Sequence, residues 1–289
     1  MTSRGTAITS WLREHEGEAL GFLERLVNQD SGTYDRPDVI KVGDLLTCTW
    51  ADLGFDVQRI AQPEVGDHVL ATRMPAGGDR ALLCIGHMDT VFHTGTAASR
   101  PFRIVGDRAT GPGVLDMKGG LTVLLFALRA LAATDSDALR GLSLGGERSN
   151  VVPGYASADA DLRVWSLGET EQVMRAFREI VGRSTVPGAT GKLSGEVSTP
   201  PWRTNEGTRR MLAVLQEAGS PLGLTFVGVT TGGGSDGSRT AQVIPTLDGP
   251  GPVGSKMHGP EDYLEVPSLL QRAALLALFL ETWYERFLP

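Results

Sequence analysis

Hydrophobic residues recur every three to four positions in some stretches and form short continuous or alternating runs in others. The first pattern predicts helices over residues 7–28, 37–53, 121–134, 169–181 and 206–219, and from residue 264 onward. The second predicts strands over residues 55–60, 68–74, 81–85, 102–105, 156–165, 192–198, 222–230 and 243–247. Helices that alternate with strands in this order predict an α/β fold, a mixed sheet with helices on both faces.

The apolar run ALLCI at residues 81–85 predicts a strand that is buried on both faces of the sheet. His87 and Asp89 follow it directly and, two positions apart, lie on one face. Asp116 precedes the apolar helical segment, whose N-terminus favours negative charge. Imidazole and carboxylate groups that meet at one sheet edge are suitable ligands for Zn²⁺. A single histidine at a strand end is more often structural, so these residues alone do not establish a metal site.

The composition narrows the class of protein. With 289 residues, 41% hydrophobic and 21% charged, the chain can form one large domain, or a main domain with a small second one, and a sizeable core. Its net charge of −7 argues against a nucleic-acid partner. We find no apolar run of membrane-spanning length and no signal-peptide pattern, so we expect no membrane association. Cys48 and Cys84 stand in apolar surroundings and are expected to be buried free thiols, which favours a cytoplasmic location.

Five motifs carry a resemblance to a known family: HMDTV at 87–91, GPGVLDMKGG at 111–120, GGERSNVVP at 145–153, GGSD at 233–236 and MHGPED at 257–262. In this order they resemble the di-zinc metallopeptidase family that includes bacterial glutamate carboxypeptidase, aminoacylase and succinyl-diaminopimelate desuccinylase. The sequence around Asp116 and His258 is most similar to that of the glutamate carboxypeptidase branch. The resemblance implies a zinc-dependent hydrolase that removes a C-terminal glutamate or deacylates N-acyl amino acids.

The same resemblance assigns roles to individual residues. His87 and His258 would each bind one of two Zn²⁺ ions, and Asp116 would bridge both ions. Asp89 would be the catalytic-site residue that orients the His87 imidazole, because a carboxylate behind a histidine ligand fixes its tautomer and raises its basicity. A glycine-rich loop would offer backbone N–H groups to the carboxylate of a small peptide or N-acyl amino acid substrate. The residues implied in substrate binding are Asn150, Gly233 and Gly234.

The sequence also departs from the family. The family's catalytic base and one zinc ligand form a Glu-Glu pair, and this chain contains no Glu-Glu. Compared with the family, a segment of several strands and helices, on the order of eighty to a hundred residues at ordinary element lengths, would be missing between residues 139 and 145. We therefore expect catalytic-domain parts at 1–140 and 201–289, and a truncated α+β inserted lid or dimerisation domain at 141–200. Such truncation weakens the expectation of a homodimer.

These departures leave three interpretations open. The chain can be an impaired hydrolase, because loss of a general base costs about 10²–10⁴-fold in rate. Glu147 lies close to the junction and is the one candidate to replace the missing base, but its motif matches a turn of the inserted domain. Alternatively, the chain is an inactive remnant or a binding protein. A minor alternative is a serine hydrolase, since residues 233–237 match G-x-S-x-G and Ser235, Asp248 and His258 follow the order of an α/β-hydrolase triad.

Overall fold

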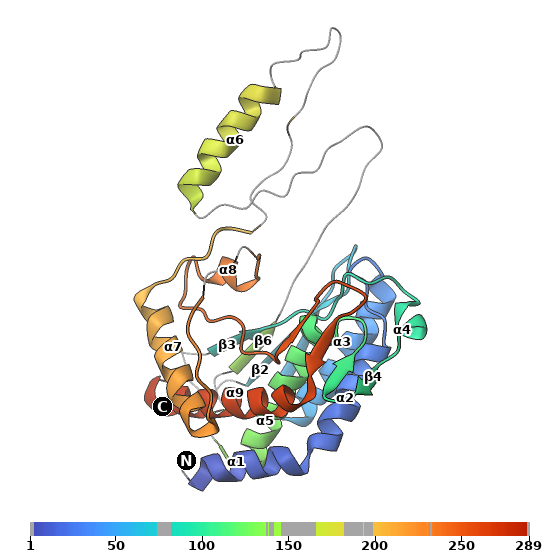
Figure 1. Ribbon diagram of the computed structural model, residues 1–289, viewed down its shortest axis with the longest axis vertical. Helices are drawn as coiled ribbons and strands as arrows, with labels where there is room; N and C mark the ends of the chain where they lie inside the picture. The colour runs from blue at the N-terminus through green and yellow to red at the C-terminus, as the bar shows by residue number, and fades with distance from the viewer. Residues whose placement is uncertain are drawn as a thin grey trace. The chain divides into compact units, whose positions relative to one another are not determined.

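The computed structural model describes residues 3–73, 82–136, 138, 142–145, 166–181, 193, 199–229, 231 and 233–287 (Figure 1). The chain divides into two compact units. The first comprises Met1–Val151, Leu212–Phe226 and Gly249–Pro289, and the second comprises Val152–Met211 and Val227–Asp248. In the described part of the chain, no helix combines the length and the apolar character needed to cross a membrane.

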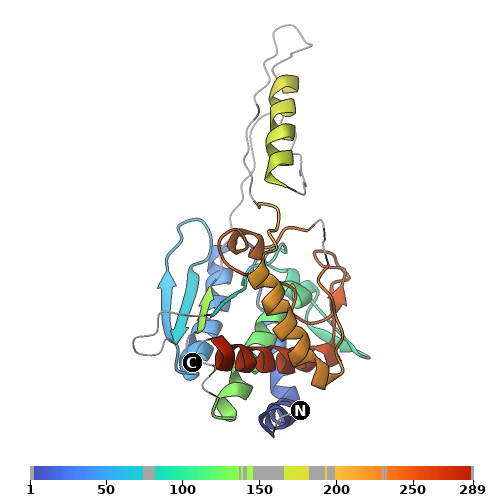
Figure 2. The ribbon, with the colours of Figure 1, turned by 90° about the vertical axis from the view of Figure 1, so that its left-hand side faces the viewer.

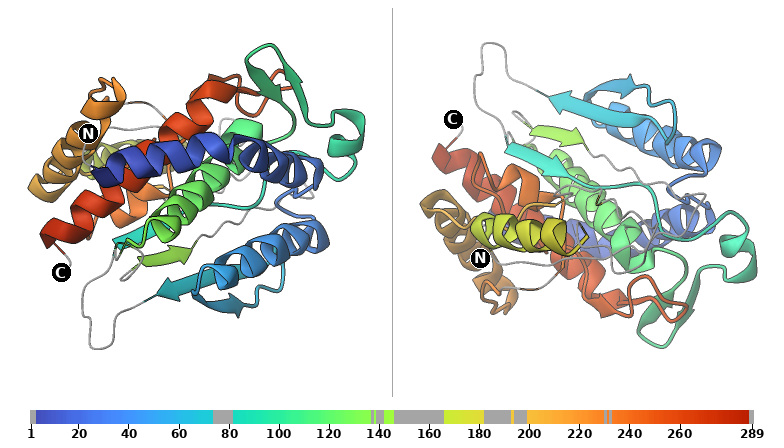
Figure 3. Two further views of the ribbon diagram at one scale, coloured as in Figure 1. Left: turned by 90° about the horizontal axis from the view of Figure 1, so that it is seen from below. Right: turned by 90° about the horizontal axis from the view of Figure 1, so that it is seen from above.

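The first unit contains a four-stranded mixed sheet. Its strands, in spatial order, are β1 (Asp56–Ile60), β2 (His68–Arg73), β6 (Leu142–Gly145) and β3 (Leu82–Ile85). The β1–β2 and β2–β6 pairs are antiparallel, whereas β3 runs parallel to β6. Helix α3 (Arg36–Asp52) packs against β1 and β2 (Figure 3). The sheet and its helices confirm the predicted α/β class, with both strand directions in one sheet.

A helical cluster forms the core of this unit. Helix α5 (Gly120–Ala133) is apolar around most of its circumference, as expected of a buried helix, and it contacts both α1 (Ser3–Glu14) and α9 (Val266–Phe287) (Figure 3). The predicted first helix is in fact two helices, since α1 ends before His15 and α2 (Glu16–Asn28) begins after it. The His15 ring stacks on Trp11 with 3.8 Å between ring centroids, and the chain turns there.

A second sheet joins distant parts of the chain. It is antiparallel, in the order β4 (Arg103–Val105), β5 (Arg108–Thr110), β8 (Tyr263–Glu265) and β7 (Gly254–Ser255). Ala109 lies opposite Leu264, and both side chains are fully buried. Short helix α4 (Thr96–Ser99) precedes β4. Because Asp116 follows β5 and His258 lies between β7 and β8, this sheet determines where both residues stand.

The second unit contains α6 (Leu167–Val181), the first half of α7 (Glu206–Gly219) and α8 (Gly237–Thr240). Within it, Gln242 donates a hydrogen bond to the carbonyl of Pro201 at 2.8 Å. The second half of α7 belongs to the first unit, where Glu217 pairs with Arg286 of α9; Figure 2 shows these helices in orange and red. The predicted strands at 156–165 and 192–198 lie outside the described residues, apart from residue 193.

Two predicted strands are wrong. The described residues of 222–230 and 243–247 form no strand, and Val227, Val229 and Val243 are 72%, 77% and 81% exposed. An apolar run becomes a strand only where a neighbouring strand supplies hydrogen-bond partners for its backbone. No such partner is found for these two runs within the described ranges.

The burial predicted for two other segments is also wrong. Strand β3 is the outermost strand of the described sheet, and Leu83 is 42% exposed rather than buried on both faces. Cys48 is exposed and Cys84 is half-buried, so they are free cysteines but not a buried pair of thiols. The predicted division into catalytic parts at 1–140 and 201–289 with an insert at 141–200 stays a proposal. Strand β6 falls at the start of the predicted insert and is part of the first sheet.

Candidate metal centre

One carboxylate faces two imidazoles in the first unit. Oδ1 of Asp116 lies 2.8 Å from Nε2 of His87, and Oδ2 lies 2.8 Å from Nε2 of His258. The three side chains come from the end of β3, the turn before α5 and the β7–β8 loop. A carboxylate that presents one oxygen to each of two histidines has the arrangement of a bridging ligand between two cations.

Local backbone geometry brings Asp116 to this position. It lies in a distorted turn, Val114–Gly119, where its own φ and ψ of −117° and 98° are not helical. Gly113, at the start of this turn, has a φ of +69°, and a Cβ there would lie 2.4 Å from the Thr90 side chain. Glycine is therefore required at position 113, both for the left-handed backbone and for the close approach. His258 also has a positive φ, of 66°, which is uncommon for a residue other than glycine.

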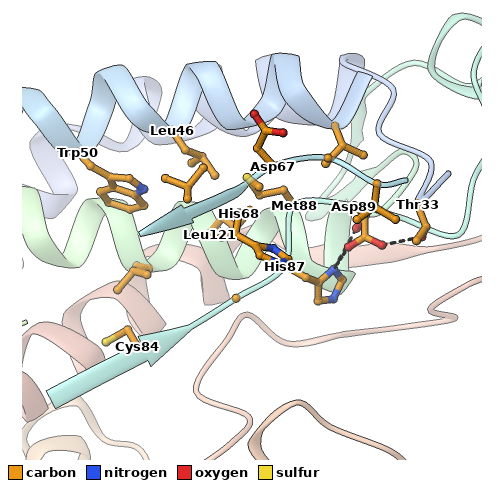
Figure 4. Close-up of a pocket in the computed structure, with 16 residues that line it drawn as sticks. Thr33, Leu46, Trp50, Asp67, His68, Cys84, His87, Met88, Asp89 and Leu121 are labelled. Carbon is orange, nitrogen blue, oxygen red and sulfur yellow. Dashed lines mark hydrogen bonds and ion pairs between the residues drawn. The ribbon is translucent and has the colours of Figure 1, made fainter. Parts of the chain in front are cut away.

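The His87 ring is held on its second nitrogen as well. Nδ1 lies 3.0 Å from the backbone carbonyl of Asp89 and 3.3 Å from its Oδ1. On the far side of Asp89, the Thr33 hydroxyl donates a hydrogen bond to Oδ2 at 2.5 Å (Figure 4). Nδ1 is thus engaged by Asp89 while Nε2 faces Asp116, which is the orientation that a histidine ligand needs.

The electrostatics of the site favour a protonated His87 in the absence of metal. Burial alone would lower the pKa of His87, but hydrogen bonds and charge interactions with Asp116 and Asp89 outweigh it and raise the pKa to about 10. The hydrogen bond from His87 in turn holds the pKa of Asp116 well below its usual range, against the effect of burial. Metal binding would therefore displace a proton from His87.

The donors present match a two-metal site in type but not in number. Each candidate metal position has one imidazole nitrogen and one oxygen of Asp116, whereas Zn²⁺ sites use three or four protein ligands. Within the described ranges, no group of three or more His, Cys, Asp or Glu side chains converges around a single point. The residues therefore fit a metal pair only in part.

Two pockets meet at this site. A small one is lined by Thr33, His87, Asp89, Asp116 and His258, together with Thr90, Val91 and Phe92. The larger pocket extends from His87 along α3 and the strands, with Trp50, Leu46 and Leu121 among its apolar walls (Figure 4). His258, whose side chain is 58% exposed, is the most exposed of the three facing residues and also lines the small pocket.

Two further charged residues lie at the loop that carries His258, Arg100 beside it and Asp262 within it. Arg100 donates a hydrogen bond from Nη1 to the carbonyl of Gly259 at 2.9 Å and stacks over the Phe92 ring. Asp262, four residues after His258, is 1% exposed. Burial raises the pKa of Asp262 to about 6, although the charge of Arg100 opposes this.

The residues singled out from the sequence fall into two groups. His87, Asp89, Asp116 and His258 lie together, whereas Asn150 and Glu147 lie outside the described residues. Gly233, Gly234, Ser235 and Asp248 belong to the second unit, where both glycines are exposed. The sequence analysis missed Thr33 and Arg100, because their contacts are with residues far along the chain, and it gave no role to Asp262 within its MHGPED motif.

Comparison with known proteins identifies the family. Residues 83–282 match the family described as Peptidase family M20/M25/M40. Carboxypeptidase G2 from Pseudomonas sp. (strain RS-16) is 41% identical over 111 residues, which cover 38% of this chain and 26% of that protein. The match thus spans about a quarter of the relative's length.

Solved structures show the same fold. A tripeptidase from Staphylococcus aureus superposes with a TM-score of 0.67 at 17% identity, covering 94% of this chain and 99% of that chain. A dinuclear metal-binding peptidase of the M20 family from Bacillus subtilis gives a TM-score of 0.64 at 12% identity, with coverage of 94% and 99%. Together with the family match over residues 83–282, these findings show that the chain belongs to peptidase family M20/M25/M40.

Proposed function

We propose that this chain is a metal-dependent hydrolase of peptide or amide bonds whose metal site is incomplete and whose activity is low. The observation that carries the proposal is the contact of the two Asp116 oxygens with one imidazole each, at 2.8 Å on both sides. His87 and His258 would each hold one Zn²⁺, and Asp116 would bridge the ions. The dinuclear metal-binding relative from Bacillus subtilis supports this arrangement.

Bound Zn²⁺ would polarise the scissile carbonyl and lower the pKa of a water molecule. The chain's own residues supply the rest of the site. Asp89 orients His87 through Nδ1, and Val91 and Phe92 line the small pocket together with Asp116. The His258 ring is more exposed than His87 and Asp116, so its placement depends on the β7–β8 loop.

Low activity follows from what the sequence lacks. No Glu-Glu pair is present to act as base and terminal ligand, and a missing general base costs about 10²–10⁴-fold. Two protein ligands per metal are also too few for a normal zinc site. We therefore propose hydrolysis at least about a thousandfold slower than in an intact relative.

For the substrate, we propose a small peptide with a C-terminal glutamate or an N-acyl amino acid. The identity to carboxypeptidase G2 supports a carboxypeptidase-like specificity. Asn150 would help to hold the substrate, and the backbone N–H groups of Gly233 and Gly234 would contact its carboxylate. A cytoplasmic location stays a prediction, and the proposed truncation of the inserted domain argues against a homodimer.

A non-catalytic protein is the second candidate, and the absence of Glu-Glu is the observation that favours it. The serine-hydrolase alternative is disfavoured, because Nε2 of His258 is engaged by Asp116 and the triad gives no role to His87 or Asp89. A serine-reactive phosphonate distinguishes it, since a phosphonate would inactivate a serine hydrolase and a chelator would not.

The experiment is the release of glutamate from an N-acyl-glutamate or folate-like substrate, with added Zn²⁺ or with EDTA. Slow release that requires Zn²⁺ supports the impaired hydrolase, and equal background in both samples supports the non-catalytic protein. Turnover of several per second, abolished by EDTA, would contradict the proposed impairment and make Glu147 the first residue to replace.

A further inference from the structure

We propose that Thr33 is a positioning residue for the metal site, which fixes Asp89 and thereby the His87 ring. The inference rests on the proposed function, because it assigns a role within the same site. Thr33 lies in the segment DSGT at residues 30–33, between α2 and α3, which the sequence presents only as a break between two helices.

Three hydrogen bonds and one ion pair connect Thr33 to both imidazoles. Its hydroxyl lies 2.5 Å from Oδ2 of Asp89, and the other oxygen of Asp89 lies 3.3 Å from Nδ1 of His87. From His87 the series continues through Asp116 to His258, with 2.8 Å at each step. Thr33 is thus the first member of the series and comes from a segment that carries no metal ligand.

The hydroxyl of Thr33 has a single proton, and the geometry assigns it to Asp89. The alternative acceptor, the carbonyl of Thr90, lies 3.2 Å away, compared with 2.5 Å for Oδ2 of Asp89. A hydrogen bond to an ionised group is shorter and stronger than a neutral one, which agrees with this assignment. Asp89 then has a partner on each carboxylate oxygen, and both partners oppose its rotation away from His87.

The backbone holds Thr33 in place independently of its side chain. The amide of Thr90 donates to the carbonyl of Ser31 at 2.7 Å, and the amide of Thr33 donates to the carbonyl of Thr90 at 3.1 Å. Gly32 forms an isolated parallel bridge with Thr90. A Cβ on Gly32 would lie 2.7 Å from the carbonyl oxygen of Phe92, so the absence of a side chain lets the two segments approach.

Because this backbone ladder does not depend on the hydroxyl, the Thr33→Val variant should fold and lose only the hydrogen bond to Asp89. Thr33→Ser retains the hydroxyl. The matched control is Thr94→Val, since Thr94 also donates its hydroxyl to a carboxylate, that of Asp38, at 2.7 Å and outside the candidate site. The two valine variants each remove one hydroxyl–carboxylate hydrogen bond, and Thr33→Ser keeps it.

The test has two readouts. Calorimetric titration should show about tenfold weaker Zn²⁺ binding in Thr33→Val, within the 10–100-fold range for residues behind a metal ligand, and near-wild-type binding in Thr33→Ser and Thr94→Val. The second readout uses metal-free protein labelled with ¹⁵N-histidine, in which only five histidines contribute signals. The Nδ1–H proton of His87 should be visible in the wild type and in Thr94→Val, and should exchange faster with solvent in Thr33→Val.

The two readouts separate the inference from the proposed function. If the wild type binds no Zn²⁺ but the His87 proton responds to Thr33→Val as expected, the proposed function fails and the positioning role stands. A His87 Nδ1–H signal that is absent from the wild type, unchanged in Thr33→Val, or equally affected in Thr94→Val overturns the positioning role.

Discussion

Nε2 of His258 lies 2.8 Å from Oδ2 of Asp116, although 142 residues separate the two in the sequence. The contact depends on the pairing of β5 with β8, in which Thr110 stands opposite Tyr263. One strand leads into the turn of Asp116, and the other follows the loop of His258. The relative positions of Asp116 and His258 therefore depend on this short sheet and on the turn that carries Asp116.

Gly113→Ala should destabilise the protein more than Gly95→Ala. Both glycines have a positive φ, of 69° and 92°, so both variants carry the cost of a left-handed alanine, about 1–2 kcal/mol. Only at Gly113 would the new Cβ meet a neighbour, Thr90 at 2.4 Å, whereas nothing lies within 4 Å at Gly95. Overpacking adds about 1–3 kcal/mol to the Gly113 variant. Urea unfolding measures both variants, and equal free energies of unfolding would contradict the tight packing of Gly113 against Thr90.

The stability of the metal-free protein should fall as the pH rises from 6.5 to 8. The pKa of His87 is raised from its usual 6.5 to about 10, so above pH 6.5 the unfolded chain releases a proton that the folded protein keeps. The stabilisation that the protonated His87 provides is complete below pH 6.5 and is lost progressively toward pH 10. We restrict the measurement to pH 8 because burial lowers the pKa of Lys118 to about 8, which has the opposite effect at higher pH.

Urea midpoints in EDTA at pH 6.5, 7.2 and 8.0 check this prediction for the wild type and for His87→Gln. The variant lacks the titrating imidazole, so its midpoint should change less over this range. A decline of equal size in both proteins would show that another group is responsible.

Val229→Thr should be nearly neutral, within about 0.5 kcal/mol, because Val229 is 77% exposed and forms no strand. The control is Val123→Thr in α5, where the side chain is 2% exposed. Replacing a methyl group with a hydroxyl at this buried position costs about 1–3 kcal/mol. Thermal unfolding distinguishes the two, and a large loss in Val229→Thr would mean that the run at 222–230 is buried after all.

Helices were predicted well where their sequence pattern decided the outcome. The pattern at 206–219 coincides with α7, and the apolar run after Gly120 coincides with α5, because helical hydrogen bonds are made within the segment itself. The runs at 222–230 and 243–247 have strand-like composition, but strand formation depends on partners elsewhere in the chain. The split at His15 was missed because the hydrophobic spacing continues across it.

The candidate site likewise contains residues that local sequence signals predict and residues whose roles depend on distant contacts. His87 and Asp89 were found from a strand end, and Asp116 from a helix start, so short sequence signals sufficed for them. The pairing of His258 with Asp116 came only from the family resemblance, since no local pattern connects residues 142 positions apart. Thr33 carried no signal, because a threonine after a glycine is common in turns and its role depends on the contact with Asp89.

The most direct test of a shared, incomplete metal site is a calorimetric Zn²⁺ titration of the wild type, Asp116→Asn and Asp107→Asn. Asp116 faces both histidines, so its replacement should abolish binding at both positions together, whereas Asp107 is an exposed carboxylate in the turn between β4 and β5. We predict micromolar or substoichiometric binding in the wild type, the same binding in Asp107→Asn, and none in Asp116→Asn. Two tightly bound Zn²⁺ ions per chain, or binding that survives in Asp116→Asn, would contradict the account.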